Sequence, residues 1–126
     1  MSPPVVATSP LGDELELRAL AKETCSAYDA EFPDERERYG PAGIQWCVHD
    51  VQHILNWAAL SLTGSLAFLE QIAWLARILE GRDFPLDRLA RGLELCAQTL
   101  DQHHPRERAL VARLLEGATF VRSQIL

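Results

Sequence analysis

The sequence predicts an all-α protein, a single-domain bundle of about five helices that run mostly antiparallel, up and down. Three observations support this class. Apolar residues recur at steps of three and four along nearly the whole chain, which is the periodicity of an amphipathic helix. No segment alternates between apolar and polar residues over a strand length, so no sheet is expected. Short loops separate the later helices, and such loops place neighbouring helices antiparallel.

Residues 1–10 are predicted to form a flexible N-terminal arm, and residues 11–126 the helical bundle domain. The arm contains three prolines and no apolar periodicity, which is typical of an irregular segment. From residue 11 the apolar positions recur at helical spacing as far as Phe32. Pro33 lacks a backbone donor, so it ends the first helix, which is predicted over residues 11–32.

The second predicted helix, residues 44–62, is interpreted as the central element of the bundle. Residues 33–43 precede it and are rich in charge and in helix breakers, which favours a connector with one helical turn. The helix carries one apolar stripe through Leu55, while Trp46 and Trp57 lie on another flank. A helix that is apolar around most of its circumference is buried on several sides.

Three further helices complete the predicted bundle. One spans residues 66–80, the next begins at Pro85, and the last begins at about Pro105, where a proline suits the first helical position. Gly92 and Gly117 lie inside the apolar patterns of the last two helices. Each glycine lowers the helix propensity, so each is interpreted as a close crossing of two helices.

The charge and hydropathy of the chain exclude two classes of partner. The sequence has 12 Lys and Arg against 18 Asp and Glu, a net charge of −6 and a pI of about 5.1. A nucleic-acid partner is not expected, because binding to the phosphate backbone depends on basic residues. The longest uncharged stretch, residues 51–69, contains several polar residues, so no membrane span is expected either.

The cysteines predict reduced thiols in a cytoplasmic protein. Cys25, Cys47 and Cys96 are odd in number, widely spaced and placed inside helical patterns. A buried cysteine usually acts as a small apolar side chain, and no CxxC motif or Cys/His pairing suggests zinc. Residues 1–10 also lack the charged and apolar regions of a signal peptide.

Four side chains of the central helix form the candidate ligand-binding site: Trp46, Asp50, His53 and Trp57. Offsets of four, seven and eleven residues place them on one side of the helix. A carboxylate and an imidazole between two indoles would suit a flat ligand, which the rings stack on and the polar pair orients. The alternative is a buried seam in which Asp50 is hydrogen bonded to His53 and the tryptophans fill the core. The residues alone leave both alternatives open.

His49 and His53 also lie one helical turn apart, the spacing with which a helix offers two imidazoles to a metal ion. A metal site needs further ligands, and the neighbouring helices offer only Glu70, Glu80 and Glu94, none in a Glu-x-x-His pairing. No metal and no cofactor are therefore predicted. Catalytic residues are not predicted either, since the sequence contains no nucleophile-elbow motif.

A longer stretch resembles a known type of domain. Residues 67–100 read AFLEQIAWLARILEGRDFPLDRLARGLELCAQTL, and they follow Arg38-Tyr39-Gly40 and Cys47-x-x-Asp50. These residues resemble a helical domain of bacterial sensory and regulatory proteins, which in some of them precedes a cobalamin-binding domain. The resemblance extends over residues 30–100 and implies a regulatory or sensory module. It gives His53 no ligand role, because the family pattern has its histidine where this chain has Ile54, and the cobalamin-binding pattern Asp-x-His-x-x-Gly is absent.

Two functions follow from these observations. The first is a non-enzymatic regulatory module that acts through protein–protein contact, as a homodimer or with another protein. It is expected because Phe68, Leu75 and Ile78 point away from the main apolar stripe of the helix over residues 66–80, and surplus apolar surface marks partner sites. The alternative is a small-molecule sensor that binds an aromatic or tetrapyrrole-like ligand at the candidate site.

Overall fold

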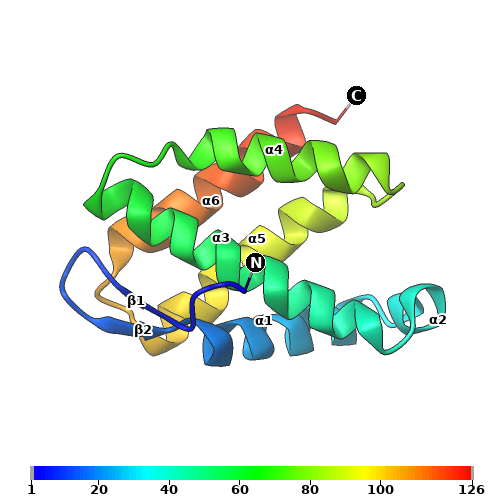
Figure 1. Ribbon diagram of the computed structural model, residues 1–126, viewed down its shortest axis with the longest axis horizontal. Coiled ribbons are helices and arrows are strands. Elements are labelled where there is room, and N and C mark those ends of the chain that lie inside the picture. The colour runs from blue at the N-terminus through cyan, green and yellow to red at the C-terminus, as the bar shows by residue number, and fades with distance from the viewer. Residues whose placement is uncertain (1, 126) are drawn as a thin grey trace.

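A computed structural model describes residues 2–125 and consists mainly of helices (Figure 1). Its elements are β1 (Val6–Thr8), β2 (Glu14–Glu16), α1 (Leu17–Glu31), α2 (Asp34–Tyr39), α3 (Ala42–Thr63), α4 (Phe68–Gly81), α5 (Leu86–His103) and α6 (Arg108–Ser123). About 73% of the chain is helical, which confirms the all-α bundle. Within the described residues, however, there are six helices, and β1 and β2 form a two-stranded sheet. None of these helices is long and apolar enough to cross a membrane.

The long helices reverse direction from one to the next, and α3 lies at the centre of the arrangement (Figure 1). α3 contacts α1, α4 and α6, whereas α5 packs against α6 and α1. The inward side of α3 is apolar and buried over Val51, Ile54, Leu55, Ala58 and Ala59. Ile44, Trp46 and Leu60 of the same helix are exposed, so the prediction of a central helix buried on several sides is wrong.

The sixth helix is α2, which occupies the segment expected to be a connector with one helical turn. Asp34, Glu35 and Glu37 lie in its first turn, and Arg36 and Arg38 lie in its last turn. This order of charges suits the positive N-terminal and negative C-terminal ends of a helix dipole. The charged residues of this segment led to the prediction of a connector, but their order along the chain also stabilises a short helix.

The N-terminal residues contradict the prediction of a fold without a sheet, and part of the predicted N-terminal arm forms a strand. β1 pairs antiparallel with β2, with Val6 opposite Glu16 and Thr8 opposite Glu14. The first helix consequently begins at Leu17 and not at residue 11. Strands of three residues are too short to show a periodic pattern, since alternation needs several repeats to be recognised.

A buried polar pair fastens this N-terminal segment to the bundle. Ser9 and Glu107 are 2% and 1% exposed, and the Ser9 hydroxyl donates a hydrogen bond to the Glu107 carboxylate. The backbone N–H of Asp13 donates to Ser9 Oγ over 2.8 Å. Glu107 is the residue before α6. A buried carboxylate is costly unless it is hydrogen bonded, so Ser9 holds the turn between the strands against the start of α6.

Of the two helix-interior glycines, Gly117 matches its interpretation as a close crossing. A Cβ atom at Gly117 on α6 would lie 2.9 Å from Cε2 of Phe68 on α4 and 3.5 Å from Cδ1 of Leu93 on α5. Such a contact is shorter than van der Waals packing allows, so only glycine permits this approach of the helices.

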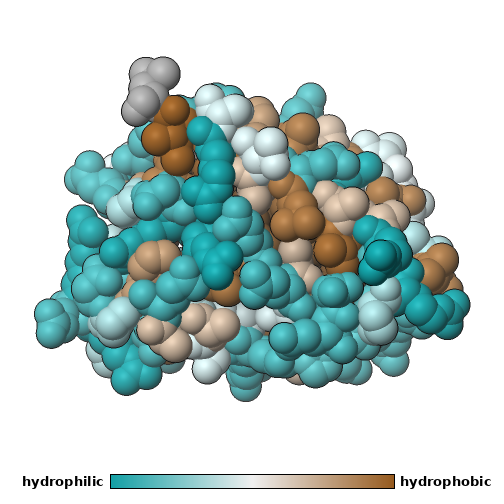
Figure 2. Space-filling view, turned by 180° about the vertical axis from the view of Figure 1, so that it is seen from behind, coloured by the Kyte–Doolittle hydropathy of each residue, from teal (hydrophilic) through white to brown (hydrophobic). Residues whose placement is uncertain are grey.

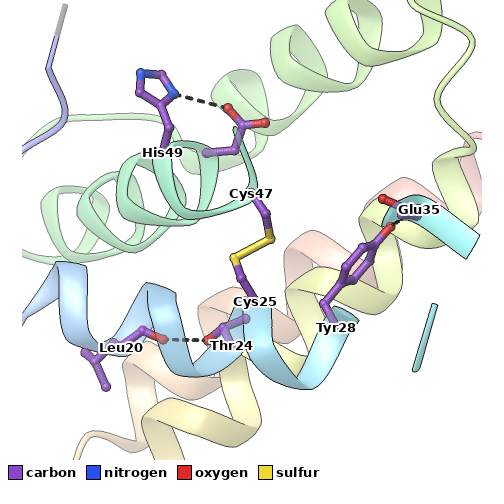
Figure 3. Close-up of a disulfide and its surroundings, with 8 residues drawn as sticks. Leu20, Thr24, Cys25, Tyr28, Glu35, Cys47 and His49 are labelled. Atoms are coloured by element: carbon purple, nitrogen blue, oxygen red, sulfur yellow. Dashed lines mark hydrogen bonds and ion pairs between the residues drawn. A yellow bond between two sulfur atoms is a disulfide. The ribbon is translucent and has the colours of Figure 1, made fainter. Parts of the chain in front are cut away.

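The cysteines contradict the prediction of reduced thiols. Cys25 of α1 and Cys47 of α3 form a disulfide that joins the two helices, with their Cα atoms 6.0 Å apart (Figure 3). Cys96 is a free, buried thiol, and burial raises its pKa to about 12. The pairing arises because antiparallel packing of α1 and α3 brings together two residues that are 22 positions apart. The alignment of Cys25 with Cys47 depends on how the two helices pack in the tertiary fold, so the spacing of the cysteines in the sequence did not predict it.

Candidate functional site

A cavity of about 420 Å³ lies between α3, α4 and α5, with Tyr28 of α1 and residues of α2 also on its wall. We call it the α3–α5 cavity. Its wall is mostly apolar, and polar side chains approach it at a few points. Its lining residues from α3 to α5 include Trp46, Cys47, Asp50, Val51, Ile54, Leu75, Leu79, Leu89, Gly92 and Leu93.

Gly92 keeps this cavity open on the side of α5. A Cβ atom at Gly92 would meet no atom within 4 Å, apart from its chain neighbours and its own helix backbone. The interpretation of Gly92 as a close helix crossing is therefore wrong. Glycine therefore has different effects at the two positions. Gly117 allows the side chain of a neighbouring helix to approach, whereas Gly92 leaves an empty space beside its helix.

Three aromatic rings line one part of the cavity. Tyr39 of α2 has its ring centroid 6.3 Å from that of Trp46 on α3, and also 6.3 Å from that of Phe84 in the loop before α5. Trp46 is 56% exposed, so it connects the cavity with the surface. We call Tyr39, Trp46 and Phe84 the aromatic group. Aromatic side chains supply large, rigid contact area for a ligand.

Glu35 and Arg88 bring opposite charges to the wall, and these charges are already paired. Arg88 Nη1 lies 2.9 Å from Glu35 Oε2 and 3.0 Å from Asp34 Oδ2. The hydroxyl of Tyr28 donates a hydrogen bond to Glu35, as Figure 3 shows. Burial, together with the Glu35 carboxylate, raises the pKa of Tyr28 far above its usual range. This cluster therefore fixes α1, α2 and α5 around the cavity.

Asp50 is the other carboxylate on the wall, and it has no comparable partner. Its Oδ1 lies 3.3 Å from Nδ1 of the exposed His49 ring, the contact dashed in Figure 3. Burial raises the pKa of Asp50, while the hydrogen bond from His49 opposes the rise. Arg82 also lines the cavity, but it is exposed and forms no ion pair with Asp50.

The four side chains predicted as the site all line one groove of about 1240 Å³ between α3 and α4. Only Trp46 and Asp50 also line the α3–α5 cavity. The His53 ring stacks on Trp57 with centroids 5.6 Å apart, and Trp57 meets Trp74 edge-on at 6.3 Å. The hydrogen bond to Asp50 comes from His49, which differs from the expected Asp50–His53 bond.

The histidine pair does not extend to a metal-binding cluster. The His49 and His53 ring centroids are 4.8 Å apart, and burial together with the nearby His49 lowers the pKa of His53. Within residues 2–125, no group of three or more His, Cys, Asp or Glu side chains is placed to hold a metal ion. The pair therefore belongs to the wall of the groove.

No protein-family model, curated protein or solved structure gives a significant match to this chain. The resemblance to a helical domain of bacterial sensory proteins therefore stays a prediction. Because a fold class does not define a function by itself, the function is argued from the geometry of the cavity.

Proposed function

We propose that the protein is a non-enzymatic helical module that binds a small, largely apolar molecule in the α3–α5 cavity, and that this binding is the sensing step of a regulatory role. The observation that carries the proposal is the cavity of about 420 Å³ with its mostly apolar wall. Sites for small molecules typically have volumes of roughly 300–1,000 Å³, apolar linings and a few polar groups. The cavity has each of these properties.

The helices around the cavity are held in place before a ligand arrives. The Cys25–Cys47 disulfide joins α1 to α3, and Cys47 itself lines the cavity. Arg88 of α5 is bonded to Asp34 and Glu35 of α2. A preformed site loses less conformational entropy when it binds a ligand. The disulfide and the ion pairs of Arg88 therefore favour a cavity that stays open for a ligand over one that collapses.

Binding is favoured over catalysis because three of the polar groups of the wall, Tyr28, Glu35 and Arg88, are engaged with each other. The Tyr28 hydroxyl and the Arg88 guanidinium both bond to Glu35. A general acid or base needs a polar atom within hydrogen-bond reach of the substrate proton. Apolar contact with the wall, at about 25 cal/mol per Å² of buried apolar surface, is the dominant source of affinity for a ligand here.

Filling the cavity from Gly92 is expected to weaken binding strongly without unfolding the protein. The side chain of Gly92→Leu would occupy open space, so a neutral fluorescent probe, N-phenyl-1-naphthylamine, should bind at least about tenfold more weakly than to the parent, a loss of about 1.4 kcal/mol. Probe titration measures this loss. Gly92→Ala is the matched control, because it raises helix propensity by roughly 1 kcal/mol and leaves most of the volume free. Equal affinity of the parent and Gly92→Leu would place the probe elsewhere.

Self-association is a second candidate function, favoured by apolar side chains on the surface. Trp46, Leu60, Leu69 and Trp74 of α3 and α4 are all exposed. However, Phe68 and Leu75, on which the expectation of surplus apolar surface depended, are buried in the core. On the face opposite to that of Figure 1, apolar side chains form a short band and small groups among polar ones (Figure 2).

If the exposed side chains of α4 form a dimer interface, light scattering at micromolar concentration should give a mass near twice 14.1 kDa. A two-fold dimer is the commonest way to cover such a surface. Trp74→Glu, at a position 49% exposed, should then yield a folded monomer. Leu75→Glu on the same helix should instead unfold the protein, because Leu75 is buried. A parent mass of 14.1 kDa at all concentrations would exclude this candidate.

A further inference from the structure

We propose that the α3–α5 cavity selects organic cations, with the ammonium group of the ligand held between the Asp50 carboxylate and the aromatic group of Tyr39, Trp46 and Phe84. This inference rests on the proposed function, because it concerns the same cavity. It adds the chemical class of the ligand, an apolar molecule that carries a positive charge.

The charges on the cavity wall support a cation. Glu35 and Arg88 are 2.9 Å apart and largely neutralise each other. Asp50 and Arg82 remain, and no ion pair joins them. Arg82 is exposed while Asp50 is half-buried, and water and salt screen an exposed charge far more than a buried one. Asp50 is paired with the exposed His49 ring, 3.3 Å away, so the negative charge of Asp50 is the least compensated charge that a ligand meets inside the cavity.

The aromatic group supports the same ligand class independently of Asp50. The planes of Tyr39 and Trp46 are inclined by 66°, and those of Tyr39 and Phe84 by 34°, so Tyr39 lies next to two rings whose faces point in different directions. The electron-rich face of an aromatic ring attracts a cation, and cages of such rings bind quaternary ammonium groups. The Arg38 guanidinium already lies 5.6 Å from the Tyr39 centroid. Among the described residues no cation lies over Trp46 or Phe84, so these two rings are free for a ligand.

The pH dependence of binding distinguishes a cation from a neutral ligand. A bound cation stabilises the ionised form of Asp50, whose pKa is raised by burial in the free protein. His49, His53 and Arg82 also face Asp50, and their positive charge opposes the rise in its pKa. Affinity for the cation should fall as the pH decreases through the pKa of Asp50, and protonation of either histidine acts in the same direction because it adds positive charge near the ligand. Affinity for a neutral ligand of the same shape should not show this fall, because the ligand has no charge to pair with the carboxylate.

The test compares three probes of similar size: phenyltrimethylammonium, its neutral isostere tert-butylbenzene, and the anion benzoate. Each is titrated against the parent protein at neutral pH by displacement of N-phenyl-1-naphthylamine. The cation is expected to bind at least about tenfold more tightly than the neutral isostere, the size of effect that a desolvated cation–π contact supplies. Benzoate should bind most weakly, because it would lie next to Asp50.

Two pairs of variants test the assigned side chains. Asp50→Asn should remove the preference for the cation, whereas Glu70→Gln, which lies in the groove outside the cavity, should retain it. Trp46→Leu should weaken binding of the cation more than that of tert-butylbenzene, and Trp74→Leu is its control with similar exposure, 49% against 56%. Because Trp46 is exposed, this pair keeps the test valid even if Asp50→Asn fails to fold.

The outcomes separate this inference from the proposed function. If tert-butylbenzene binds in the cavity and Gly92→Leu blocks it, but the cation binds no more tightly, the cation preference is wrong and the proposed function stands. Tightest binding by benzoate would also overturn the inference, and it would indicate recognition by Arg82. Failure of all three probes to bind would overturn both proposals.

Discussion

Leu55→Asp is expected to unfold the protein at room temperature. Leu55 lies on α3 with 1% of its surface exposed, among core residues contributed by several helices. The change removes an apolar side chain, which costs about 2–5 kcal/mol in a core, and it buries a carboxylate without a partner, which costs several kcal/mol more. These losses together are comparable with the whole stability of a domain, about 5–15 kcal/mol.

Far-UV circular dichroism and a thermal melt measure this effect. Leu60→Asp is the matched control, because Leu60 lies on the same helix and is 43% exposed. The control should keep the helical spectrum and melt close to the parent. A Leu55→Asp variant that melted within a few degrees of the parent would contradict the burial of Leu55 in the core.

Loss of the Cys25–Cys47 disulfide is expected to lower the free energy of unfolding by about 3 kcal/mol. The bond closes a loop between residues 22 positions apart, and the chain-entropy model gives about 3 kcal/mol for a loop of this order. The effect arises mainly because the cross-link restricts the unfolded chain. It should appear as a lower urea midpoint for the Cys25→Ala, Cys47→Ala double variant.

The same midpoint measured with and without dithiothreitol provides the control. Reductant should lower the stability of the parent to that of the double variant and should leave the double variant unchanged. Cys96→Ala should keep the response of the parent, because Cys96 is not part of the bond. If the midpoint of the parent did not change with reductant, the bond would contribute nothing to stability.

The main helices could be predicted from the sequence because each carries an apolar stripe of several turns. The stripe through Leu55 predicted the helix α3, and Val51, Leu55 and Ala58 of that stripe are buried, whereas Ile44 at its start is exposed. β1 and β2 were missed because each has only three residues, so period two could not be distinguished from chance. Here pairing with a neighbouring strand, and not a local pattern, determines the structure.

The candidate site was predicted in part. Trp46 and Asp50 line the α3–α5 cavity, whereas His53 and Trp57 lie only in the neighbouring groove. Tyr39 and Phe84 were missed because they lie in segments rich in charge and in helix breakers, which resemble solvated connectors. Gly92 inside a predicted helix was the one sign of the cavity in the sequence. A glycine in a helix can mark either a close crossing of two helices or an open space, and only the position of the neighbouring helix distinguishes the two.

The hydrogen bond from Ser9 to Glu107 has a consequence for the time course of folding. The two residues are 98 positions apart, so this contact is among the most non-local in the chain. During synthesis at roughly 5–20 residues per second, Ser9 waits roughly 5–20 seconds before its acceptor has been made. During that interval the turn between β1 and β2 lacks its hydrogen bond to Glu107. The contact of the N-terminal segment with the start of α6 therefore forms after the pairing of β1 with β2, which needs only nearby residues.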